Sequence, residues 1–519
     1  MISYCIRLFK QIRKLYQIKT HLDNIIIGFS IDNTNTNKNT NTNTNSNNEN
    51  KQNIIQQQNF ESLKQIIFEN GSLYIKFFQW YISKIKANII NNDTIESQNT
   101  IKFIKYFEDI FEQCPYHDLE HTKSIFTEST NGIELEDYLD ISTFKAIASG
   151  SIGQIYYGRR KEDGLEVAIK VKHPNIEADL SNQTELIQLI KVFQSISFFR
   201  NRYSLFFNLD DFLYDINLQC DFNNEADNSI SFRENFKDSS HLIVFPRVIY
   251  QSKDLLISEY IEGTEFNDLS PMQKFNTSIN FNCFFYQMLL VDNFIHGDLH
   301  CKNWKVRVID NDNKQQQQIQ IIVYDCGICF KNINVQISQD FWFSLVKYDI
   351  NGLTKVLKTM IEYTNPGCNT DNFSEEISKI FDNILIQNMG TNIILKSIIN
   401  FFRANNIKIH KFLLNFSILI CVLEEFLKSN DVIDRDKNEI IKTSMFDIIN
   451  DGELDVMTFC DVKNCYPKVR ELFASHKKDK ITQYKNNVIK NKIDEGINID
   501  NKLFSSISLS GMIFRNPDI

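Results

Sequence analysis

Hydrophobic positions follow a helical period in the segment after residue 54. In SLYIKFFQWYISKIK, apolar side chains recur at intervals of three and four residues, at Tyr74, Phe77, Phe78, Tyr81, Ile82 and Ile85. This spacing places them on one stripe of an α-helix, with Lys76 and Gln79 on the opposite face. We therefore expect a helical extension over residues 54–140 whose apolar stripe docks on other structure.

The pattern changes to strands near residue 141. AIASGSIGQIYYGRR and EVAIKVKHP are two strand-like runs, and EDG between them is a turn signal. After a helical stretch, HLIVFPRVIY and DLLISEYIEG read as two more strands. From Asp268 onward the pattern is mostly helical, apart from the strands WKVRVID and IQIIVYDCGI. A strand-rich part followed by a helical part predicts an α+β fold of two lobes, an N-lobe over 141–265 and a C-lobe with a helical tail over 266–519.

Three segments stand apart from this pattern. Residues 32–53 are Asn-rich and of low complexity, so we expect a linker that buries no core. A Gln-rich tract from Asp310 is expected to form an exposed hairpin tip. The apolar run FLLNFSILICVLEEFL, from Phe412, contains polar residues and falls short of the ~18 residues of a membrane span, so it predicts a buried helix.

Composition narrows the class of protein. The 519 residues carry a net charge of −9, which argues against nucleic acid as the main partner. The 11 cysteines show no even framework and indicate reduced thiols in an intracellular compartment. Residues 1–31 begin with a basic amphipathic stretch typical of a mitochondrial targeting segment, although a solvated basic helix has the same pattern.

Four short motifs carry chemistry. ASGSIGQ, residues 148–154, is a small-residue turn that lets backbone amides approach phosphate groups. VAIK places Lys170 on the next strand, within reach of the α- and β-phosphates of a nucleotide. FIHGDLHCKNW supplies Asp298 and Asn303, and VYDCG places Asp325 at a strand end. Each motif alone has a simpler explanation, because polar and glycine-rich turns occur in many folds.

The order of the four motifs predicts a protein-kinase-like fold that uses ATP and Mg²⁺. An Asp in the position of Asp298 orients or deprotonates the attacking hydroxyl group, and oxygen atoms of Asn303 and Asp325 are ligands that Mg²⁺ prefers. Backbone groups of Glu259 to Ile261 are expected to bind adenine, since they follow the fifth strand. Cys326 then belongs to the metal-binding tripeptide, and Cys329 is interpreted as a packing residue rather than half of a redox pair.

The sequence resembles the UbiB-type (aarF-domain) atypical kinases, a group associated with ubiquinone (coenzyme Q) biosynthesis, and most resembles a divergent mitochondrial branch. The resemblance rests on AIASGSIGQIYYG, VAIKVKHP, QCDFNNEADN, FPRV, HGDLHCKN and YDCGI. It implies that Asp298, Lys170 and Glu225 are catalytic, with Glu225 rather than Glu185 as the carboxylate partner of Lys170. The segment that it implies for nucleotide binding comprises Ile147, Ala148, Ser149, Gly150, Ser151, Ile152, Gly153, Gln154 and Ile155.

The resemblance also changes the interpretation of the first helix. KFFQ, residues 76–79, resembles a Lys-x-Gly-Gln signature that the family holds over its active site, which makes Lys76 and Gln79, with Asp221, a regulatory cover. Two departures affect this cover: Phe78 stands where the signature has Gly, and Gln219 stands where a Glu-x-Asp motif begins with Glu. The core ATP and metal residues are intact.

The resemblance implies an ATP-binding kinase or ATPase that supports ubiquinone biosynthesis in mitochondria. An isoprenoid-quinone precursor, an anionic lipid and other ubiquinone-biosynthesis proteins are the implied partners, with peripheral rather than transmembrane attachment. Two alternatives stay open. A Ser/Thr protein kinase is disfavoured because no APE-like anchor follows Gly327. A nucleotide-binding pseudokinase scaffold is allowed by the departures, although the retained Asp298, Asn303 and Asp325 weigh against it.

Overall fold

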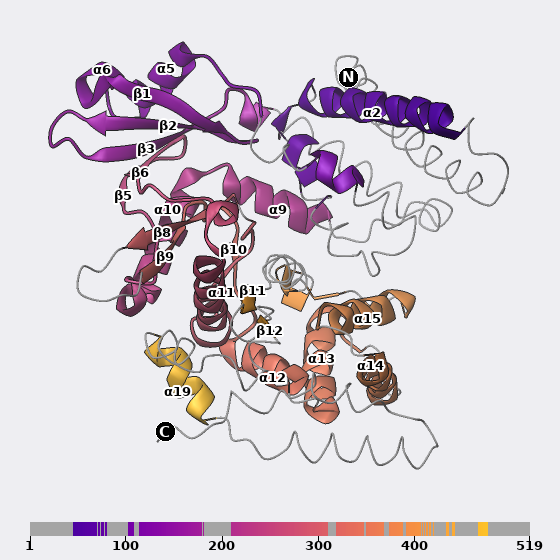
Figure 1. Ribbon diagram of the computed structural model, residues 1–519. Coiled ribbons are helices and arrows are strands. Elements are labelled where there is room, and N and C mark those ends of the chain that lie inside the picture. The colour runs from indigo at the N-terminus through magenta and orange to yellow at the C-terminus, as the bar shows by residue number, and fades with distance from the viewer. Residues whose placement is uncertain are drawn as a thin grey trace. The chain divides into compact units, whose positions relative to one another are not determined.

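The chain folds into two compact units in the computed structural model (Figure 1). The structure describes residues 45–69, 71–72, 74–76, 78–79, 82, 102–107, 114–178, 180, 209–300, 302–309, 318–346, 349–367, 373–387, 391–405, 407, 409–410, 412–413, 415–416, 419, 432–434, 439–441 and 466–475. Unit 1 comprises Met1–Asn224 and Val248–Tyr260, and unit 2 comprises Glu225–Arg247 and Ile261–Ile519. Unit 1 contains the largest described sheet, and unit 2 contains most of the labelled helices together with shorter sheets, which confirms the predicted α+β class.

Unit 1 contains a five-stranded antiparallel sheet in the order β1-β2-β3-β6-β5. Its strands are β1 (Leu139–Ser149), β2 (Gly153–Arg160), β3 (Glu166–Lys172), β5 (Val248–Gln251) and β6 (Leu255–Glu259). The single strand predicted for HLIVFPRVIY is wrong, because this run splits into β5 and β4 (Ile243–Val244), which belongs to a sheet of unit 2. Pro246 explains the split, since proline has no N–H with which to continue a ladder.

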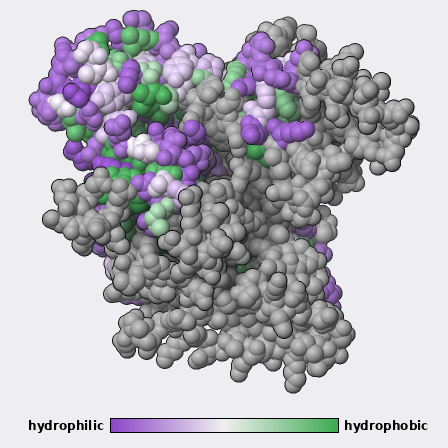
Figure 2. Space-filling view, viewed as in Figure 1, coloured by the Kyte–Doolittle hydropathy of each residue, from purple (hydrophilic) through white to green (hydrophobic). Residues whose placement is uncertain are grey.

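One face of this sheet packs against helix α5 (Leu119–Ser129) and the short α6 (Leu135–Tyr138). Val167, Ile169 and Val171 alternate along β3 and pack with Phe126 of α5 in one buried cluster. Because strand side chains alternate between faces, Lys170 projects from the opposite side of the sheet. Hydrophilic residues dominate the outer surface of the sheet in Figure 2.

The N-terminal extension of unit 1 has a separate core. Helix α2 (Asn45–Glu69) supplies Phe60, Leu63 and Ile67 to it. The other members are Tyr74, Ile75, Phe78, Ile82, Phe103, Ile104, Phe107 and Cys114. The predicted apolar stripe is therefore confirmed at Tyr74, Phe78 and Ile82, whereas Phe77, Tyr81 and Ile85 lie outside the described residues.

The predicted linker ends earlier than expected, because α2 already begins at Asn45 within the Asn-rich segment. Once a helix is nucleated by its packed end, each added residue gains a backbone hydrogen bond, so elongation extends into polar sequence. The remainder of the segment, and residues 1–31, lie outside the described part of the chain.

The helices of unit 2 enclose one large buried cluster. They are α10 (Phe222–Asn235, which begins in the last residues of unit 1), α11 (Pro271–Tyr286), α12 (Val335–Val346), α13 (Ile350–Thr364), α14 (Phe373–Gln387), α15 (Thr391–Ala404) and α19 (Pro467–Ser475). Helix α9 (Leu209–Gln219) belongs to unit 1. A capping box between Ser270 and Gln273, with Pro271 in the first turn, fixes the start of α11. The Tyr466 hydroxyl donates to the Asn280 side chain and ties α19 to α11.

Short sheets complete unit 2. Strand β9 (Gln318–Val323) pairs with β8 (Trp304–Ile309) and β4, while β7 (Ile295–His296) pairs with β10 (Cys329–Phe330), and β11 (Val432–Asp434) pairs with β12 (Glu439–Ile441). The strands predicted on both sides of the Gln-rich tract are confirmed as an antiparallel pair, and the tip between them lies outside the described residues.

The apolar run from Phe412 belongs to the core of unit 2. Its described apolar positions, Phe412, Leu413, Phe416 and Leu419, are all buried in the main cluster. Among the helices that the structure describes, none is long and apolar enough to cross a bilayer.

Candidate functional site

The segment between β1 and β2, residues 149–153, is called the nucleotide loop below. Its backbone is held from several directions: the Cys114 N–H donates to the Ser149 carbonyl at 3.0 Å, and the Gly150 N–H donates to the Gly153 carbonyl at 3.0 Å. A Cβ atom on Gly153 would lie 2.9 Å from the Val171 carbonyl oxygen and 2.9 Å from the Phe222 ring. Only glycine fits at this position, because the loop and β3 approach each other too closely for a side chain.

Lys170 lies on β3, opposite Ile155 of β2. Its ammonium nitrogen stands 5.2 Å from the centre of the Phe222 ring, and the neighbouring Lys172 stands 5.8 Å from the same ring. Lys172 is engaged elsewhere, since its nitrogen lies 2.5 Å from Asp254 and 3.2 Å from Glu177. Of the two lysines on this face, Lys172 is thus committed to a carboxylate pair within unit 1.

The carboxylate predicted for Lys170 is Glu225, which is buried at the start of unit 2. The pairing of Glu225 with Lys170 stays a prediction, and the alternative, Glu185, lies outside the described residues.

The predicted cover touches the nucleotide loop. Gln79 is 5% exposed, and its side-chain oxygen accepts a hydrogen bond from the Ser151 hydroxyl at 3.4 Å. The half-buried Lys76 lies close enough to Cys114 to lower its pKa, although burial is the larger effect and raises the pKa of that thiol to about 12. The polar face of this helix is therefore partly buried against other parts of unit 1 rather than fully exposed to solvent.

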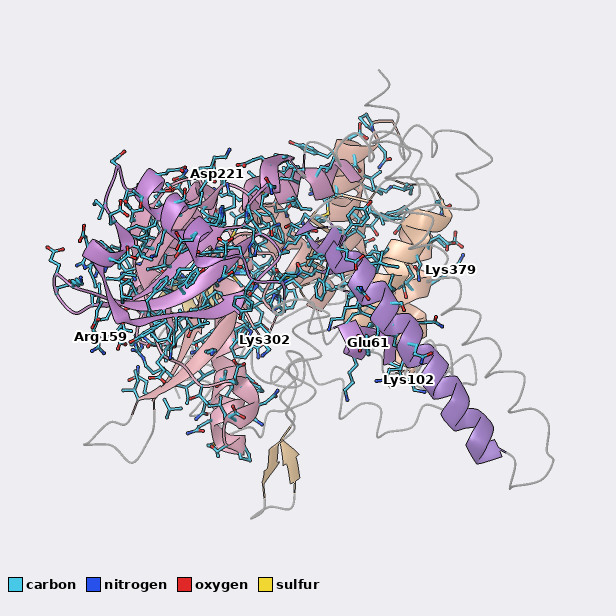
Figure 3. The ribbon with its side chains drawn as sticks, turned by 90° about the horizontal axis from the view of Figure 1, so that it is seen from above. Glu61, Lys102, Arg159, Asp221, Lys302 and Lys379 are labelled. Atoms are coloured by element: carbon cyan, nitrogen blue, oxygen red, sulfur yellow. The ribbon has the colours of Figure 1, made fainter. Side chains whose placement is uncertain are left out.

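The structure shows the surroundings of Phe78 and Gln219, the two residues at which the cover departs from the family motifs. Phe78 is buried in the core of the extension, 6.4 Å from the Phe107 ring. The buried Gln219 donates to the Asp215 carbonyl at 3.1 Å, a bond within its own helix. Asp221, labelled in Figure 3, accepts from the Asn223 N–H at 3.0 Å and so caps α10. Phe78 and Asp221 thus have local structural roles in addition to the predicted one.

In unit 2, the predicted catalytic and metal-binding segments are joined by backbone pairing. Strands β7 and β10 place His296 opposite Cys329. Beyond them, the Gly297 N–H donates to the Ile328 carbonyl at 2.8 Å, and a Cβ at Gly297 would lie 2.7 Å from the Ile328 side chain. The Tyr324 N–H donates to the Asn303 carbonyl at 3.0 Å. These contacts fix Asp298, Asn303 and Asp325 in one part of unit 2.

His296 bridges the two predicted acidic residues. This side chain is fully buried, and its Nε2 donates to the Asp325 carbonyl. A carbonyl can only accept, so Nε2 carries the proton and Nδ1 accepts from the Asp298 N–H, at 3.1 Å. Burial lowers the pKa of His296, while Asp298 and Asp325 act in the opposite direction. The neutral ring therefore sets the backbone positions of both residues.

The oxygen donors of Asn303 and Asp325 fit Mg²⁺. The Asn303 side-chain nitrogen donates to the Asp298 carbonyl at 2.7 Å, which leaves the amide oxygen for a cation. One carboxylate oxygen of Asp325 accepts from the Gly327 N–H at 2.8 Å. Within the described residues, no group of three or more His, Cys, Asp or Glu side chains forms a metal cage. Mg²⁺ commonly takes one or two protein oxygens and completes its shell with phosphates and water.

The predicted adenine-binding segment coincides with the passage from unit 1 to unit 2, between Tyr260 and Ile261. Its backbone is partly engaged: the Tyr260 N–H donates to the Glu166 carbonyl at 2.9 Å, and the Ile261 carbonyl accepts from the Tyr324 hydroxyl at 2.9 Å. Because the peptide is trans and planar, the Glu259 carbonyl points away from β3. That carbonyl and the Ile261 N–H are the groups left to recognise a base.

The CxxC pair is not a disulfide. Neither Cys326 nor Cys329 forms a disulfide, and the Cys329 thiol donates to the Cys326 carbonyl at 3.3 Å. Burial raises the pKa of the Cys329 thiol, so the less reactive protonated form is favoured. These contacts agree with a packing role for Cys329.

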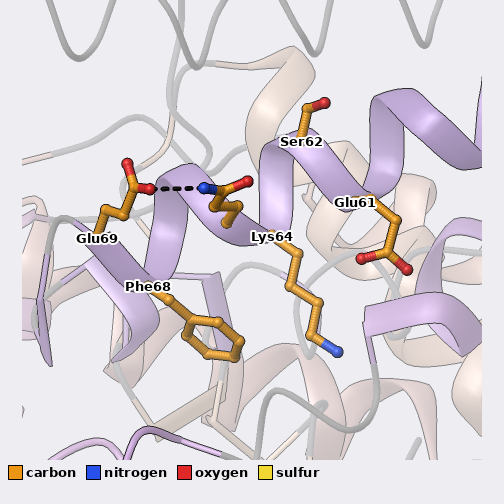
Figure 4. Close-up of a pocket in the computed structure, with 6 residues that line it drawn as sticks. Glu61, Ser62, Lys64, Phe68 and Glu69 are labelled. Atoms are coloured by element: carbon orange, nitrogen blue, oxygen red, sulfur yellow. Dashed lines mark hydrogen bonds between the residues drawn. The ribbon is translucent and has the colours of Figure 1, made fainter.

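A shallow groove lies on α2, outside these segments (Figure 4). Its lining consists of Glu61, Ser62, Lys64, Gln65, Phe68 and Glu69. The Gln65 side chain donates to Glu69 at 2.8 Å, a contact typical of one helix face. None of these residues belongs to the predicted site, and their open, mixed surface gives no ligand chemistry.

Three functional contacts were not foreseen from the sequence: the His296 bridge, the close approach at Gly297, and the two bonds made by Tyr324. The only available signal was the position of these residues directly beside Asp298 and Asp325 in the motifs.

Comparisons with known proteins agree with this geometry. Residues 109–357 match the family model of the ABC1 atypical kinase-like domain. The chain is 29% identical to the probable serine/threonine-protein kinase abkC of Dictyostelium discoideum, over 49% of this chain and 36% of that protein. It is 24% identical to the probable protein kinase UbiB of Shewanella woodyi, over 52% of this chain and 47% of that protein. The chain thus spans less than half the length of these two relatives.

Among solved structures, the erythromycin complex of Rv3197 from Mycobacterium tuberculosis aligns with a TM-score of 0.38 at 18% identity, over 53% of this chain and 68% of that chain.

Proposed function

Since residues 109–357 match the family model of the ABC1 atypical kinase-like domain, we propose that the protein is an enzyme that uses Mg²⁺ and ATP, either an atypical kinase or an ATPase. In this proposal the nucleotide loop and Lys170 of unit 1 bind the phosphates of ATP, and Asn303 and Asp325 of unit 2 are ligands of Mg²⁺. The metal would neutralise charge on the phosphates, and Asp298 would orient the attacking hydroxyl group or water.

The bridge made by His296 carries the proposal. Its fully buried, neutral imidazole ring is hydrogen-bonded to the backbone of both Asp298 and Asp325 and holds both in place. Phosphoryl transfer depends on such positioning, because most of its catalysis comes from orientation and charge stabilisation. A scaffold that only binds nucleotide has no need for a positioned base at Asp298.

We further propose that the acceptor is small. The relatives include a protein named UbiB, and the resemblance to that family favours a phenolic quinone precursor or water as the acceptor, near an anionic lipid surface. The basic N-terminal segment favours a mitochondrial location. Fractionation of cells that express the full-length chain checks the location, and cytosolic residence would contradict it.

The decisive experiment is ATP turnover by the purified full-length protein, with Asp298→Asn as the blank. Turnover would be measured alone, with a prenylated phenol, with anionic liposomes, and with both. Turnover above the blank identifies an enzyme, and stimulation by the phenol identifies a small-molecule substrate. Nucleotide binding without turnover in any condition would instead identify a pseudokinase scaffold.

The cover predicts that generic peptides are poor substrates. Gln79 is buried against Ser151 of the nucleotide loop, so an extended peptide would have to displace the helix that carries it. We expect negligible phosphorylation of a generic peptide by the wild-type protein. Gln79→Ala removes one hydrogen bond, worth about 1 kcal/mol, and should change the affinity for ATP several-fold.

The matching control is Gln65→Ala, which removes a surface hydrogen bond of α2 away from the loop and should leave nucleotide binding unaltered. Phe78→Gly is a poorer test, because Phe78 is a core residue and its loss would unfold the extension first. Brisk peptide phosphorylation by the wild type would overturn the idea of a cover.

A further inference from the structure

A continuous chain of side-chain hydrogen bonds reaches the nucleotide loop from the face of the sheet that packs against α5. Going toward the loop, the Gln154 amide bonds the Tyr156 hydroxyl at 2.7 Å, and Tyr156 bonds the Thr122 hydroxyl at 2.6 Å. Thr122 then bonds His117 Nε2 at 2.8 Å, and His117 Nδ1 lies 2.7 Å from His173 Nδ1. The last bond joins His173 Nε2 to the Gly150 carbonyl at 3.0 Å.

Burial lowers the pKa of both histidines, and with both rings neutral the carbonyl at its end fixes the direction of each bond in this chain. The Gly150 carbonyl only accepts, so His173 Nε2 carries a proton and His173 Nδ1 accepts one from His117 Nδ1. His117 Nε2 must then accept from the Thr122 hydroxyl, which in turn accepts from Tyr156. The Ser149 hydroxyl, 3.5 Å from His173 Nε2, donates instead to the Pro115 carbonyl at 3.1 Å. The two neutral rings are therefore in opposite tautomers.

His173 holds two peptide units of the loop at once. Its ring donates to the Gly150 carbonyl, and its backbone N–H donates to the Ile152 carbonyl at 2.9 Å. The peptide bonds here are trans, so the N–H on the far side of each unit points the opposite way. The Ser151 N–H is thereby turned away from His173. Successive N–H groups turned to one side form the concave anion-binding arrangement known from phosphate sites.

We propose that His173, oriented by His117 and Thr122, is a positioning residue that presents the amides of the nucleotide loop to the phosphates of ATP. This inference rests on the proposed function, because it assumes that the loop binds phosphate. His173 touches the loop backbone and acts on the nucleotide only through it.

The environment keeps the two rings neutral. Burial, His173 and His121 lower the pKa of His117 to about 4, against the opposite effect of Asp118. Burial is also the main cause that lowers the pKa of His173, while its bond to Gly150 acts against it. A His with a lowered pKa stabilises the fold fully above about pH 6.5, and that stability is lost as the pH falls toward 4. The chain of bonds is therefore complete at neutral pH.

The test compares ATP with adenosine. His173→Phe keeps an aromatic ring but removes the donor to Gly150, so the loop amides lose their orientation. We expect ATP affinity in titration calorimetry to fall about tenfold, the worth of one charge-assisted hydrogen bond to phosphate. Adenosine, which lacks phosphate, should bind as it does to the wild type. Equal losses for both ligands, or unchanged ATP affinity, would overturn the proposal.

Two further variants keep the test decisive if His173→Phe does not fold. Thr122→Val removes the hydroxyl that His117 accepts from, with little change in volume, and should weaken ATP but not adenosine, whereas Thr122→Ser should restore wild-type binding. The control is His121→Ala: His121 bonds the Lys172 carbonyl at 2.9 Å, outside the chain of bonds, and its loss should leave ATP affinity within about twofold of the wild type. Loss of ATP affinity in His121→Ala equal to that in Thr122→Val would contradict the specific role of the chain.

Imidazole nitrogen NMR gives an independent readout. At pH 7 the spectrum should show a neutral His173 with its proton on Nε2 and a neutral His117 with its proton on Nδ1. Any other pair of tautomers would overturn the proposal. Wild-type protein that binds no ATP at all, with the expected tautomers present, would instead show that the proposed function has failed.

Discussion

Asp325→Asn should abolish the stabilisation of the protein by ATP in the presence of Mg²⁺, whereas Asp298→Asn should keep that stabilisation and lose turnover. Asp325 offers the only carboxylate of the predicted metal pair, and an amide binds Mg²⁺ far more weakly. At ATP concentrations of about 100 times the dissociation constant, the loss corresponds to about 2.7 kcal/mol of unfolding free energy. Thermal unfolding with and without Mg²⁺ and ATP measures it.

The control for Asp325→Asn is Asp292→Asn. Asp292 is also a largely buried carboxylate of unit 2, paired with Lys468 at 3.5 Å, but it lies outside the predicted motifs. This variant should change the unfolding temperature without changing the shift caused by Mg²⁺ and ATP. If Asp325→Asn is stabilised by ATP as strongly as the wild type, the assignment of the metal site is wrong.

Candidate residues for the chemistry could be named from the sequence because they occur in short motifs with a fixed order. Lys170, Asp298, Asn303 and Asp325 are each identified by near neighbours in the sequence. Lys170 lies on a predicted strand, Asn303 directly before one and Asp325 just after one, whereas the strand β7 before Asp298 was not predicted. The bonds that hold them could not be predicted in this way. His296 and Asp325 are 29 residues apart, and nothing local in the sequence indicates that one side chain donates to the carbonyl of the other.

The hydrogen bonds that hold the nucleotide loop were also not predicted, because they join residues that are far apart in the sequence. His117 and His173 are separated by 56 residues and meet only because α5 packs on the face of β3 that carries Val167 and Val171. A single histidine in a sequence does not indicate which residue its side chain will contact in the fold. The boundary errors have different causes: a proline divides one predicted strand, and helix elongation extends α2 into polar sequence.

A local sequence pattern also does not show which of two units a segment packs into. The strand HLIVFPRVIY was read as one element, yet its two halves join different sheets, one in each unit. Periodicity records which side of a segment is buried, and it does not record against which neighbour. The predicted adenine-binding segment lies where the chain passes from unit 1 to unit 2 shortly after β6, and its role in binding adenine stays a prediction.

His296→Phe should weaken both metal-dependent ATP binding and turnover, although His296 is predicted to touch neither ligand. Phenylalanine fills the buried space beside the Phe232 ring, 6.0 Å away, but leaves the Asp325 carbonyl and the Asp298 N–H without their partner. Each unsatisfied group costs about 1–3 kcal/mol, so the fold should lose a few kcal/mol and both acidic residues should shift. Stabilisation by Mg²⁺ and ATP should fall to a small fraction of the wild-type value. His300→Phe is the control, since the partly exposed His300 lies 3.7 Å from the Asp298 carboxylate and is not the residue that bridges the two backbone groups; it should retain metal-dependent ATP binding. Because His296 acts through the position of Asp325, adding His296→Phe to Asp325→Asn should cause no further loss of nucleotide stabilisation. Additive losses in that double variant, or a His296→Phe protein that responds to Mg²⁺ and ATP as the wild type does, would show that the bridge supports the fold alone.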